Sequence, residues 1–167
     1  MMMVLVIGIS APVHAASSYF VTSQSGLSLN SASANLGLEA GLRTPNYGIF
    51  AKADWNPWFS PQAVNDALKP GILNVGVGME YLFFNDRCRF AISLGTSTLL
   101  FDTALDDAFT TGFFIEMSPV SLRWSLTEEL TLQLDPTSIS LAMPVISGIP
   151  LVSFQYRHGI SLEWEPQ

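Results

Sequence analysis

The chain of 167 residues carries a net charge of −7, with 13% charged residues, 49% hydrophobic residues and a mean hydropathy of +0.34. Soluble domains usually carry about 25% charged residues, and disordered chains combine low hydrophobicity with high charge, so the composition fits neither class. Seven basic residues against fourteen acidic ones exclude a positive surface for nucleic acid. The sequence also lacks a run of about 18 uncharged apolar residues, which a transmembrane helix requires.

The first fifteen residues have the pattern of a secretory signal peptide. Met3 to Ile9 form a short apolar core, and Val13-His14-Ala15 fits the small-residue rule for cleavage. We therefore expect a signal peptide at residues 1–15 and a single domain at residues 16–167, with a buried N-terminal strand as the alternative for the first segment. Cys88 is the only cysteine, which excludes an internal disulfide.

Beyond residue 15, apolar and polar residues alternate with the period of a two-faced β-strand. In chain order the alternation predicts eight strands, at about 18–25, 33–43, 47–56, 71–84, 88–98, 111–125, 130–140 and 150–164. The alternation changes phase near Ser118-Pro119, and a bulge there keeps the apolar residues of 111–125 on one face, because proline has no N–H for the ladder. Residues 61–68 are predicted to form one short helical turn at most.

The connections between these strands alternate in length. Short turns are predicted at 44–46, 85–87 and 127–129, and longer connections at about 57–70, 99–110 and 136–149. This layout is typical of outer-membrane proteins. The predicted fold class is all-β: an eight-stranded antiparallel up-and-down transmembrane β-barrel with short periplasmic turns and longer outer loops. A soluble lipocalin-like carrier, with its apolar face turned inward, is an alternative.

The polar face of the strands carries both signs of charge together with glycine and serine, which suits a crowded barrel interior. An unpaired buried charge is costly, so we expect these side chains to pair. The predicted lumen charge network consists of Glu39, Arg43, Lys52, Asp54, Glu80, Arg89, Glu116, Arg123, Arg157 and Glu163.

The aromatic residues gather near the two ends of the predicted strands, with aliphatic residues between them. Two such belts match the two interfaces of a bilayer and favour the membrane barrel over the soluble one. The belt at the periplasmic end is predicted to contain Tyr47, Tyr81, Phe83, Trp124 and Trp164, and the belt at the outer end Trp55, Trp58, Phe113 and Phe154.

The alternating stretch Gly159-Ile160-Ser161-Leu162-Glu163-Trp164, together with the eight-strand layout, resembles the small eight-stranded outer-membrane barrels of the OmpA/OmpX-like group. The resemblance covers essentially the whole of residues 16–167. It implies secretion, a chaperoned passage through the periplasm, insertion by the barrel-assembly machinery and a bacterial outer-membrane location, but no particular activity.

The sequence contains few residues that could form a catalytic or metal-binding site. His158 is the only histidine after residue 15, which excludes metal sites built from several His or Cys ligands, and no cofactor is expected. A lipid hydrolase would use His158 with Ser161 and Glu163, but strand periodicity places His158 on the opposite face from the other two. We therefore expect no enzyme. Asp102, Asp106 and Asp107 form an acidic loop, predicted to be solvated, with a calcium site as the alternative.

An apolar segment near the C-terminus suggests a partner surface. So many apolar residues would be unusual in a solvated loop: Ile139, Leu141, Met143, Val145 and Ile146. His158, which strand periodicity places on the lipid-facing side, is included in this predicted surface. The sequence allows two arrangements of this segment. It could pack against the barrel or a partner, or it could extend two strands as a hairpin.

The predicted function is a structural or interaction role, as an anchor or subunit of an envelope assembly. The expected partners are outer-membrane lipid, lipopolysaccharide and other envelope proteins. A lipid A acyl hydrolase or transferase is the main alternative, and the soluble carrier is the third.

Overall fold

The computed structural model describes residues 17–28, 33–56, 71–100, 111–146, 149–150 and 152–166. Every regular element within these residues is a β-strand. The described residues contain no helix that is long and apolar enough to cross a membrane. The expected signal peptide at 1–15 and the predicted helical turn at 61–68 lie outside the described residues.

Eight long strands form the body of the molecule. They are β1 (Ser18–Ser28), β2 (Ser33–Arg43), β3 (Tyr47–Asn56), β4 (Gly71–Phe83), β5 (Cys88–Leu100), β6 (Thr111–Ser125), β7 (Leu130–Met143) and β10 (Ser153–Trp164). Two short strands, β8 (Val145–Ile146) and β9 (Ile149–Pro150), form a separate antiparallel pair.

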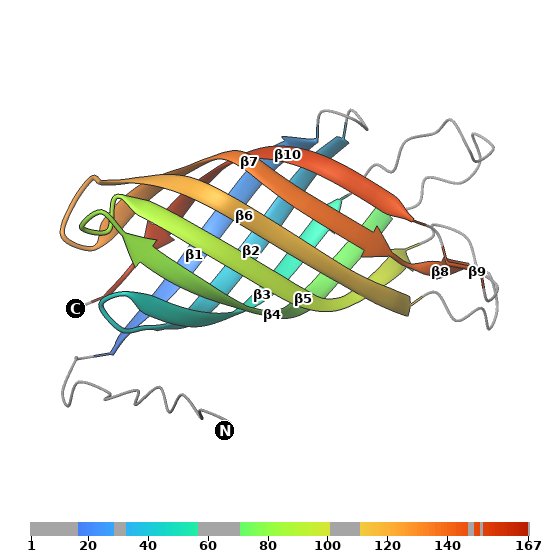
Figure 1. The fold of residues 1–167 in the computed structure, drawn as a ribbon, viewed down its shortest axis with the longest axis horizontal. Helices are drawn as coiled ribbons and strands as arrows, with labels where there is room; N and C mark the ends of the chain where they lie inside the picture. Colours follow the sequence, from blue (N-terminus) through green and yellow to red (C-terminus); the bar gives the residue numbers. More distant parts are fainter. Residues whose placement is uncertain are drawn as a thin grey trace, which may run out of the picture.

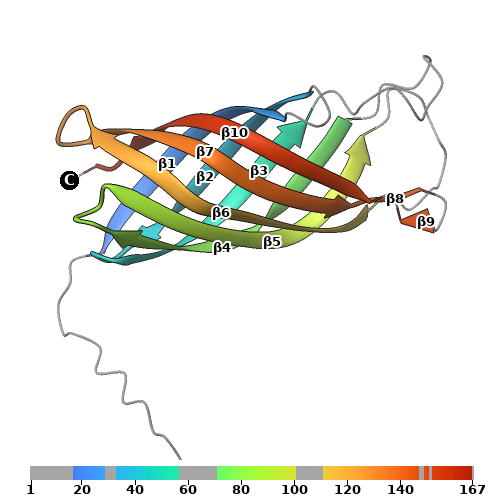
Figure 2. The same cartoon turned by 45° about the horizontal axis from the view of Figure 1, so that its top comes forward.

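The eight long strands close into one antiparallel barrel in the order β1-β10-β7-β6-β5-β4-β3-β2. The connections β2–β3, β4–β5 and β6–β7 lie at the same end of the barrel as the C-terminus, which we call the turn end (Figure 1). β8 and β9 project from the opposite end, which we call the loop end (Figures 1 and 2). In barrels of this architecture the short turns face the periplasm. The closed eight-stranded barrel confirms the fold class predicted from the sequence.

Side chains alternate between the lumen and the outer wall along most of each strand. On β3 every second residue is buried, so that Lys52 and Asp54 point inward, whereas Ile49 on the other face is 63% exposed. The buried charged side chains therefore lie in the interior, and large apolar side chains cover much of the exterior. A soluble carrier barrel has the reverse arrangement, so the structure excludes that alternative.

The turn between β4 and β5 corrects one predicted boundary. The strand predicted at 71–84 ends at Phe83, because Phe84, Asn85 and Asp86 have φ angles of 55°, 54° and 62°. This left-handed conformation cannot continue a β-ladder, and it is rare for a bulky residue such as phenylalanine. Hydrophobicity alone made Phe84 look like a strand residue.

The largest correction concerns the segment predicted as a loop at about 136–149. β7 continues to Met143 and pairs with β10 and β6 along its length, so Ile139 and Leu141 belong to the outer wall. Beyond Pro144 the chain forms the β8–β9 hairpin, which is the second of the two arrangements left open by the sequence. Smaller corrections lengthen β1 to Ser28 and β5 to Leu100, and shift the start of β10 to Ser153.

Bulges interrupt the wall around β6, β7 and β10. The register of β6 with β7 shifts between Met117 and Val120, which confirms the bulge predicted at Ser118-Pro119. A second shift, between Arg157 and Gly159 of β10, places Pro136 and Thr137 of β7 opposite the single residue His158. Both irregularities adjoin a proline, as expected from the missing N–H.

Candidate functional site

The ten side chains of the predicted charge network all lie in the lumen, and each is at most 7% exposed. Ion pairs join them into one continuous series in which positive and negative side chains alternate. We call this series the ladder. In order from the turn end it runs Arg123, Glu163, Arg43, Glu80, Arg89, Glu39, Lys52, Glu116, Arg157, Asp54. Five cations therefore balance five anions.

The turn-end part of the ladder is centred on Arg43, at the last position of β2. Its guanidinium contacts Glu80 of β4 at 2.7 Å and Glu163 of β10 at 2.7 Å. Arg123 of β6 donates to the same Glu163 carboxylate. Glu165, just past β10, adds a further contact with Arg43 at 3.1 Å. Side chains from four strands and the C-terminal tail thus converge at this end.

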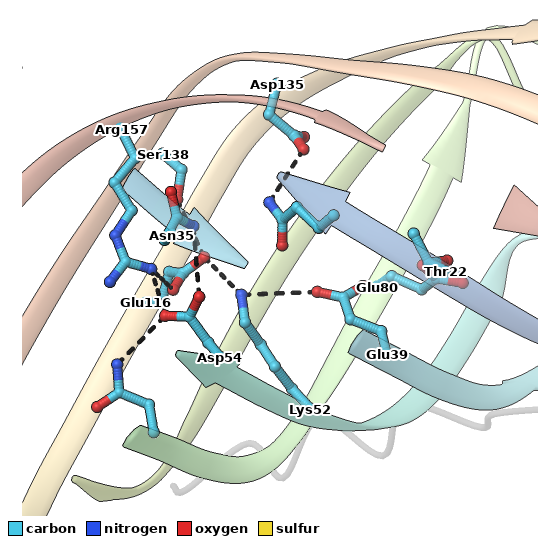
Figure 3. Close-up of polar contacts among 12 residues, drawn as sticks. Thr22, Asn35, Glu39, Lys52, Asp54, Glu80, Glu116, Asp135, Ser138 and Arg157 are labelled. Atoms are coloured by element: carbon cyan, nitrogen blue, oxygen red, sulfur yellow. Dashed lines mark hydrogen bonds and ion pairs between the residues drawn. The ribbon is translucent and has the colours of Figure 1, made fainter. Parts of the chain in front are cut away.

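The middle of the ladder passes from one side of the lumen to the other. Arg89 of β5 contacts Glu80 at 2.5 Å and Glu39 at 2.7 Å. Lys52 of β3 extends between Glu39, at 3.6 Å, and Glu116 of β6, at 2.7 Å (Figure 3). Because β3 and β6 are not neighbours in the barrel, Lys52 ties two opposite parts of the wall together.

At the loop end the ladder finishes on Asp54. Arg157 of β10 contacts Glu116 at 2.9 Å and Asp54 at 2.7 Å (Figure 3). Three asparagine side chains also donate to the Asp54 carboxylate, at 3.3 to 3.4 Å: Asn35, Asn56 and Asn74. Charge-assisted hydrogen bonds of this kind satisfy a carboxylate that water does not reach.

Apolar side chains fill the lumen beside the ladder. In the turn-end half, the guanidinium of Arg43 lies 4.3 Å from the ring centre of Phe20, and that of Arg89 lies 5.1 Å from Phe50. Towards the loop end, Ile72, Leu99 and Phe114 are at most 3% exposed. An eight-stranded barrel is just wide enough for its side chains to fill. Within the described residues, the interior therefore works as a packed core.

Glycines on the lumen face make room for these large side chains. A Cβ atom added to Gly78 would lie 2.6 Å from Cε2 of Phe50, and one added to Gly41 would lie 2.8 Å from Cβ of the same residue. These close approaches explain why glycine on the polar face suits a crowded barrel interior.

Asp135 is a sixth buried carboxylate that the predicted network omits. Its hydrogen-bond partners are neutral: Ser121 donates to Oδ1, Gln133 donates at 3.2 Å and Gln24 at 3.4 Å. Strand periodicity already places Asp135 in the lumen, but periodicity carries no information about pairing. In the part of the chain that the structure describes, no ion pair joins Asp135 to the ladder.

The aromatic residues of the two predicted belts lie on the outer wall. Tyr47, Tyr81 and Phe83 are in contact at the turn end, with ring centres 4.9 Å and 6.1 Å apart. Trp124 and Trp164 lie at the same end, and Trp55, Phe113 and Phe154 near the loop end, all 45–54% exposed. Trp58 lies outside the described residues. The sequence did not single out Tyr19 and Phe84, which are 68% and 75% exposed at the turn end.

A polar cluster on the outer wall lies between the two belts. Thr137 Oγ1 of β7 and the Tyr156 hydroxyl of β10 are 3.1 Å apart, and the Tyr156 and His158 rings meet edge to face at 5.6 Å. Ile139 and Leu141, from the predicted partner surface, flank this cluster through their pairing with Tyr156 and Phe154. We call these outward side chains, Thr137, Ile139, Leu141, Tyr156 and His158, the β7–β10 strip.

Other candidate residues are separated by the fold. His158 lies on the outer wall, whereas Ser161 and Glu163 are buried in the lumen, and Glu163 belongs to the ladder. The structure therefore does not assemble these three into a hydrolase site. No group of three or more possible metal ligands occurs among the described residues, which do not include Asp102, Asp106 and Asp107.

The remaining residues of the predicted partner surface are spread beyond the strip. Met143 ends β7, and Val145 and Ile146 form β8 at the loop end, so only part of the predicted surface lies on the barrel wall. Cys88 is half-buried at the start of β5 and has a free thiol.

No protein-family model and no curated protein matches the sequence. Neisserial surface protein A, a solved structure, is similar in fold, with a TM-score of 0.60 and 10% identity over 89% of this chain and 94% of that one. The N-terminal β-barrel domain of Pseudomonas aeruginosa OprF is also similar, with a TM-score of 0.53 and 12% identity over 89% of this chain and 97% of that one. Yersinia pestis Ail, solved with the heparin analogue sucrose octasulfate, has a TM-score of 0.50 and 10% identity over 90% of this chain and 97% of that one.

These three proteins are eight-stranded outer-membrane barrels, and at such low identity the likeness concerns the fold. The apolar outer wall adds an independent physical observation, because a surface of this kind requires a hydrocarbon environment. Fold and wall together agree with the location predicted from the sequence: the chain has the architecture of the small outer-membrane β-barrels, and it resides in the bacterial outer membrane.

Proposed function

We propose that this outer-membrane barrel serves a structural or interaction role, as an anchor or subunit that binds another envelope protein through the β7–β10 strip. The observation that carries the proposal is the polar cluster of Thr137, Tyr156 and His158 on a wall that otherwise faces lipid. The packed lumen supports it, because a barrel filled with paired charges acts through its outer surface and its loops.

The depth of the cluster makes it unusual. On β10, His158 lies four residues from Phe154 in one aromatic belt and six residues from Trp164 in the other, close to the middle of the strand. Polar and ionisable side chains at this depth are costly in lipid and usually face another protein. The imidazole can donate a hydrogen bond to a partner group or accept one from it. Ile139 and Leu141 supply apolar contact beside it.

The distribution of charge favours a protein over a polyanionic saccharide as the partner. Five of the seven basic residues belong to the ladder and Arg87 lies in the β4–β5 turn, which leaves only Lys69 in the loop-end connections. The same connections contain Asp66, Asp102, Asp106 and Asp107. Ail, solved with a sulfated saccharide analogue, shows that the fold accepts such ligands, but this chain has little basic charge for one.

Photo-crosslinking in intact outer membranes tests the proposal. A photoreactive amino acid in place of Ile139 should give a discrete protein adduct. The same residue in place of Val77, which is 61% exposed on the other side of the barrel, should give none. His158→Leu should weaken the adduct formed from position 139, because it removes the polar contact while keeping an apolar side chain of similar size.

The contrary results are equally clear. If position 139 labels only lipid, or if positions 139 and 77 give the same protein adducts, the strip does not bind a specific protein. If the adduct is unchanged by His158→Leu, the polar cluster does not contribute to the interface.

A further inference from the structure

The outer wall formed by β2, β3, β4 and β5 is hollowed, on the side of the barrel away from the β7–β10 strip. The hollow, which we call the groove, has a volume of about 740 Å³. Its floor contains Ala40 and Ala51, and Leu42, Ile49, Met79 and Leu94 stand around it. A volume of this size falls within the range of small-molecule sites, about 300–1,000 Å³.

The groove exists because small residues occupy adjacent strands. Ala40 of β2 pairs directly with Ala51 of β3, and both point outward. Gly41 and Gly78 face the lumen and contribute only backbone atoms to the lining of the hollow. On the turn-end side of Ala51 the wall rises again, since the paired residues Ile49 and Met79 project far enough to be 63% and 61% exposed.

Two tyrosines lie directly beyond the turn-end limit of the groove. The register of β3 with β4 pairs Tyr47 with Tyr81, then Ile49 with Met79, then Ala51 with Val77. The two phenol rings are 4.9 Å apart. Along the outer face, from mid-membrane towards the turn end, the groove is therefore followed by the apolar pair Ile49 and Met79 and then by two hydroxyl groups.

The dimensions of this channel suit one leaflet of the bilayer. From Tyr47 to Ala51 the strand rises by four residues, or about 13 Å, which is about 10 Å of depth at a strand tilt of about 40°. One leaflet contributes about 15 Å of hydrocarbon, half of a core about 30 Å thick. The groove thus lies within the leaflet on the turn side and ends below the membrane surface.

We propose that the groove is a binding site for an acyl chain of a phospholipid from the periplasmic leaflet, with the Tyr47 and Tyr81 hydroxyls at the level of its headgroup. None of the described residues that line the groove is charged, so the ligand it selects is apolar at this depth. The tyrosine pair supplies hydrogen bonds where that ligand becomes polar. Lipopolysaccharide resides in the opposite leaflet, at the loop end, which makes phospholipid the occupant that the position favours.

The test is lipid retention by the folded barrel. The protein is extracted from outer membranes in a mild detergent, and phospholipid bound per barrel is measured by native mass spectrometry. Ala51→Phe fills the groove and should lower retention severalfold, because the acyl chain loses the van der Waals contacts that the groove supplies. The matched control is Val120→Phe, at a 40% exposed position of β6 outside the groove, which should retain the wild-type amount.

Two further variants keep the test decisive. Ala40→Phe fills the same space from β2 and replaces Ala51→Phe if circular dichroism shows that the latter fails to fold. The pair Tyr47→Phe and Tyr81→Phe leaves the groove open but removes both hydroxyls, so retention should fall less than in the filled variants.

Three results would overturn the proposal. Equal retention by Ala51→Phe and Val120→Phe would mean that lipid only coats the wall. If Ala51→Phe lost lipopolysaccharide and kept its phospholipid, the groove would lie in the other leaflet. Loss of a co-purifying protein, with phospholipid unchanged, would make the groove a protein interface.

Discussion

The lumen and the outer wall of this barrel are built from the same strands but follow opposite rules. In the lumen, charges are kept in place by partners: Arg89, for example, bridges two carboxylates that water does not reach. On the wall, large apolar side chains predominate, and their character matches the surrounding hydrocarbon. A substitution should therefore be judged by the face it lies on, since a charge that stabilises one face destabilises the other.

Removal of a central member of the ladder should have the largest effect. Arg89→Met leaves Glu39 and Glu80 without one of their cations, and breaking a buried pair in this way costs about 3–5 kcal/mol. Urea-dependent refolding into lipid vesicles measures the free energy of unfolding. Arg87→Met is the matched control, because Arg87 is exposed in the turn, and it should change stability very little. Equal effects of the two changes would contradict a structural role for the ladder.

A charge placed on the outer wall should have the next largest effect, and its size should depend on depth. Leu38→Arg, at a 57% exposed position in the middle of β2, should cost about 2–4 kcal/mol, the penalty for arginine at the bilayer midplane. Tyr19→Arg, near the turn end, should cost about 0–1 kcal/mol. The same refolding assay compares them. A wall that tolerates arginine equally at both positions would not be facing lipid.

Crowding in the lumen should have an intermediate effect. Gly78→Ala brings a methyl group against the Phe50 ring, and overpacking of this kind costs about 1–3 kcal/mol. Phe50→Leu in the same chain should recover part of the loss, because a smaller side chain leaves space for the methyl group. If the double variant is as unstable as the sum of the single ones, the two residues do not compete for space.

The smallest effect is expected for the carboxylate outside the ladder. Asp135→Asn keeps a side chain of the same shape that can still accept hydrogen bonds from Ser121 and Gln133, and it leaves no cation without its partner. Its effect on the free energy of unfolding should stay within about 1 kcal/mol, the range of a single hydrogen bond. A loss as large as that of Arg89→Met would show that Asp135 is part of the charge network.

The sequence was informative wherever a pattern of period two decided the structure. Strands β2, β3 and β6 begin and end where alternation predicts, and the inward position of Lys52 follows from the same pattern. The pattern failed where the backbone itself changed, as at Phe84, whose positive φ ends β4. It also failed at β7, where the alternating residues Ile139, Leu141 and Met143 continue a strand through a segment predicted as a loop.

The pairing within the lumen could not be predicted, for a physical reason. Lys52 and Glu116 lie on β3 and β6, and Arg157 and Asp54 on β10 and β3, which are not neighbouring strands. Their contacts depend on the height of each residue in the closed barrel and on the reach of each side chain across it. Neither quantity is visible in the spacing of residues along the chain.

The central claim, a lipid-facing wall around a packed charged lumen, is tested most directly by spin labels placed one at a time along β4 in a Cys88→Ser background. After insertion into lipid vesicles, accessibility to oxygen and to a water-soluble paramagnetic reagent is measured from position 73 to position 83. We predict high oxygen accessibility at Val75, Val77 and Met79, and low accessibility to both reagents at Asn74 and Glu80. Accessibility of the first three positions to the water-soluble reagent would contradict the account.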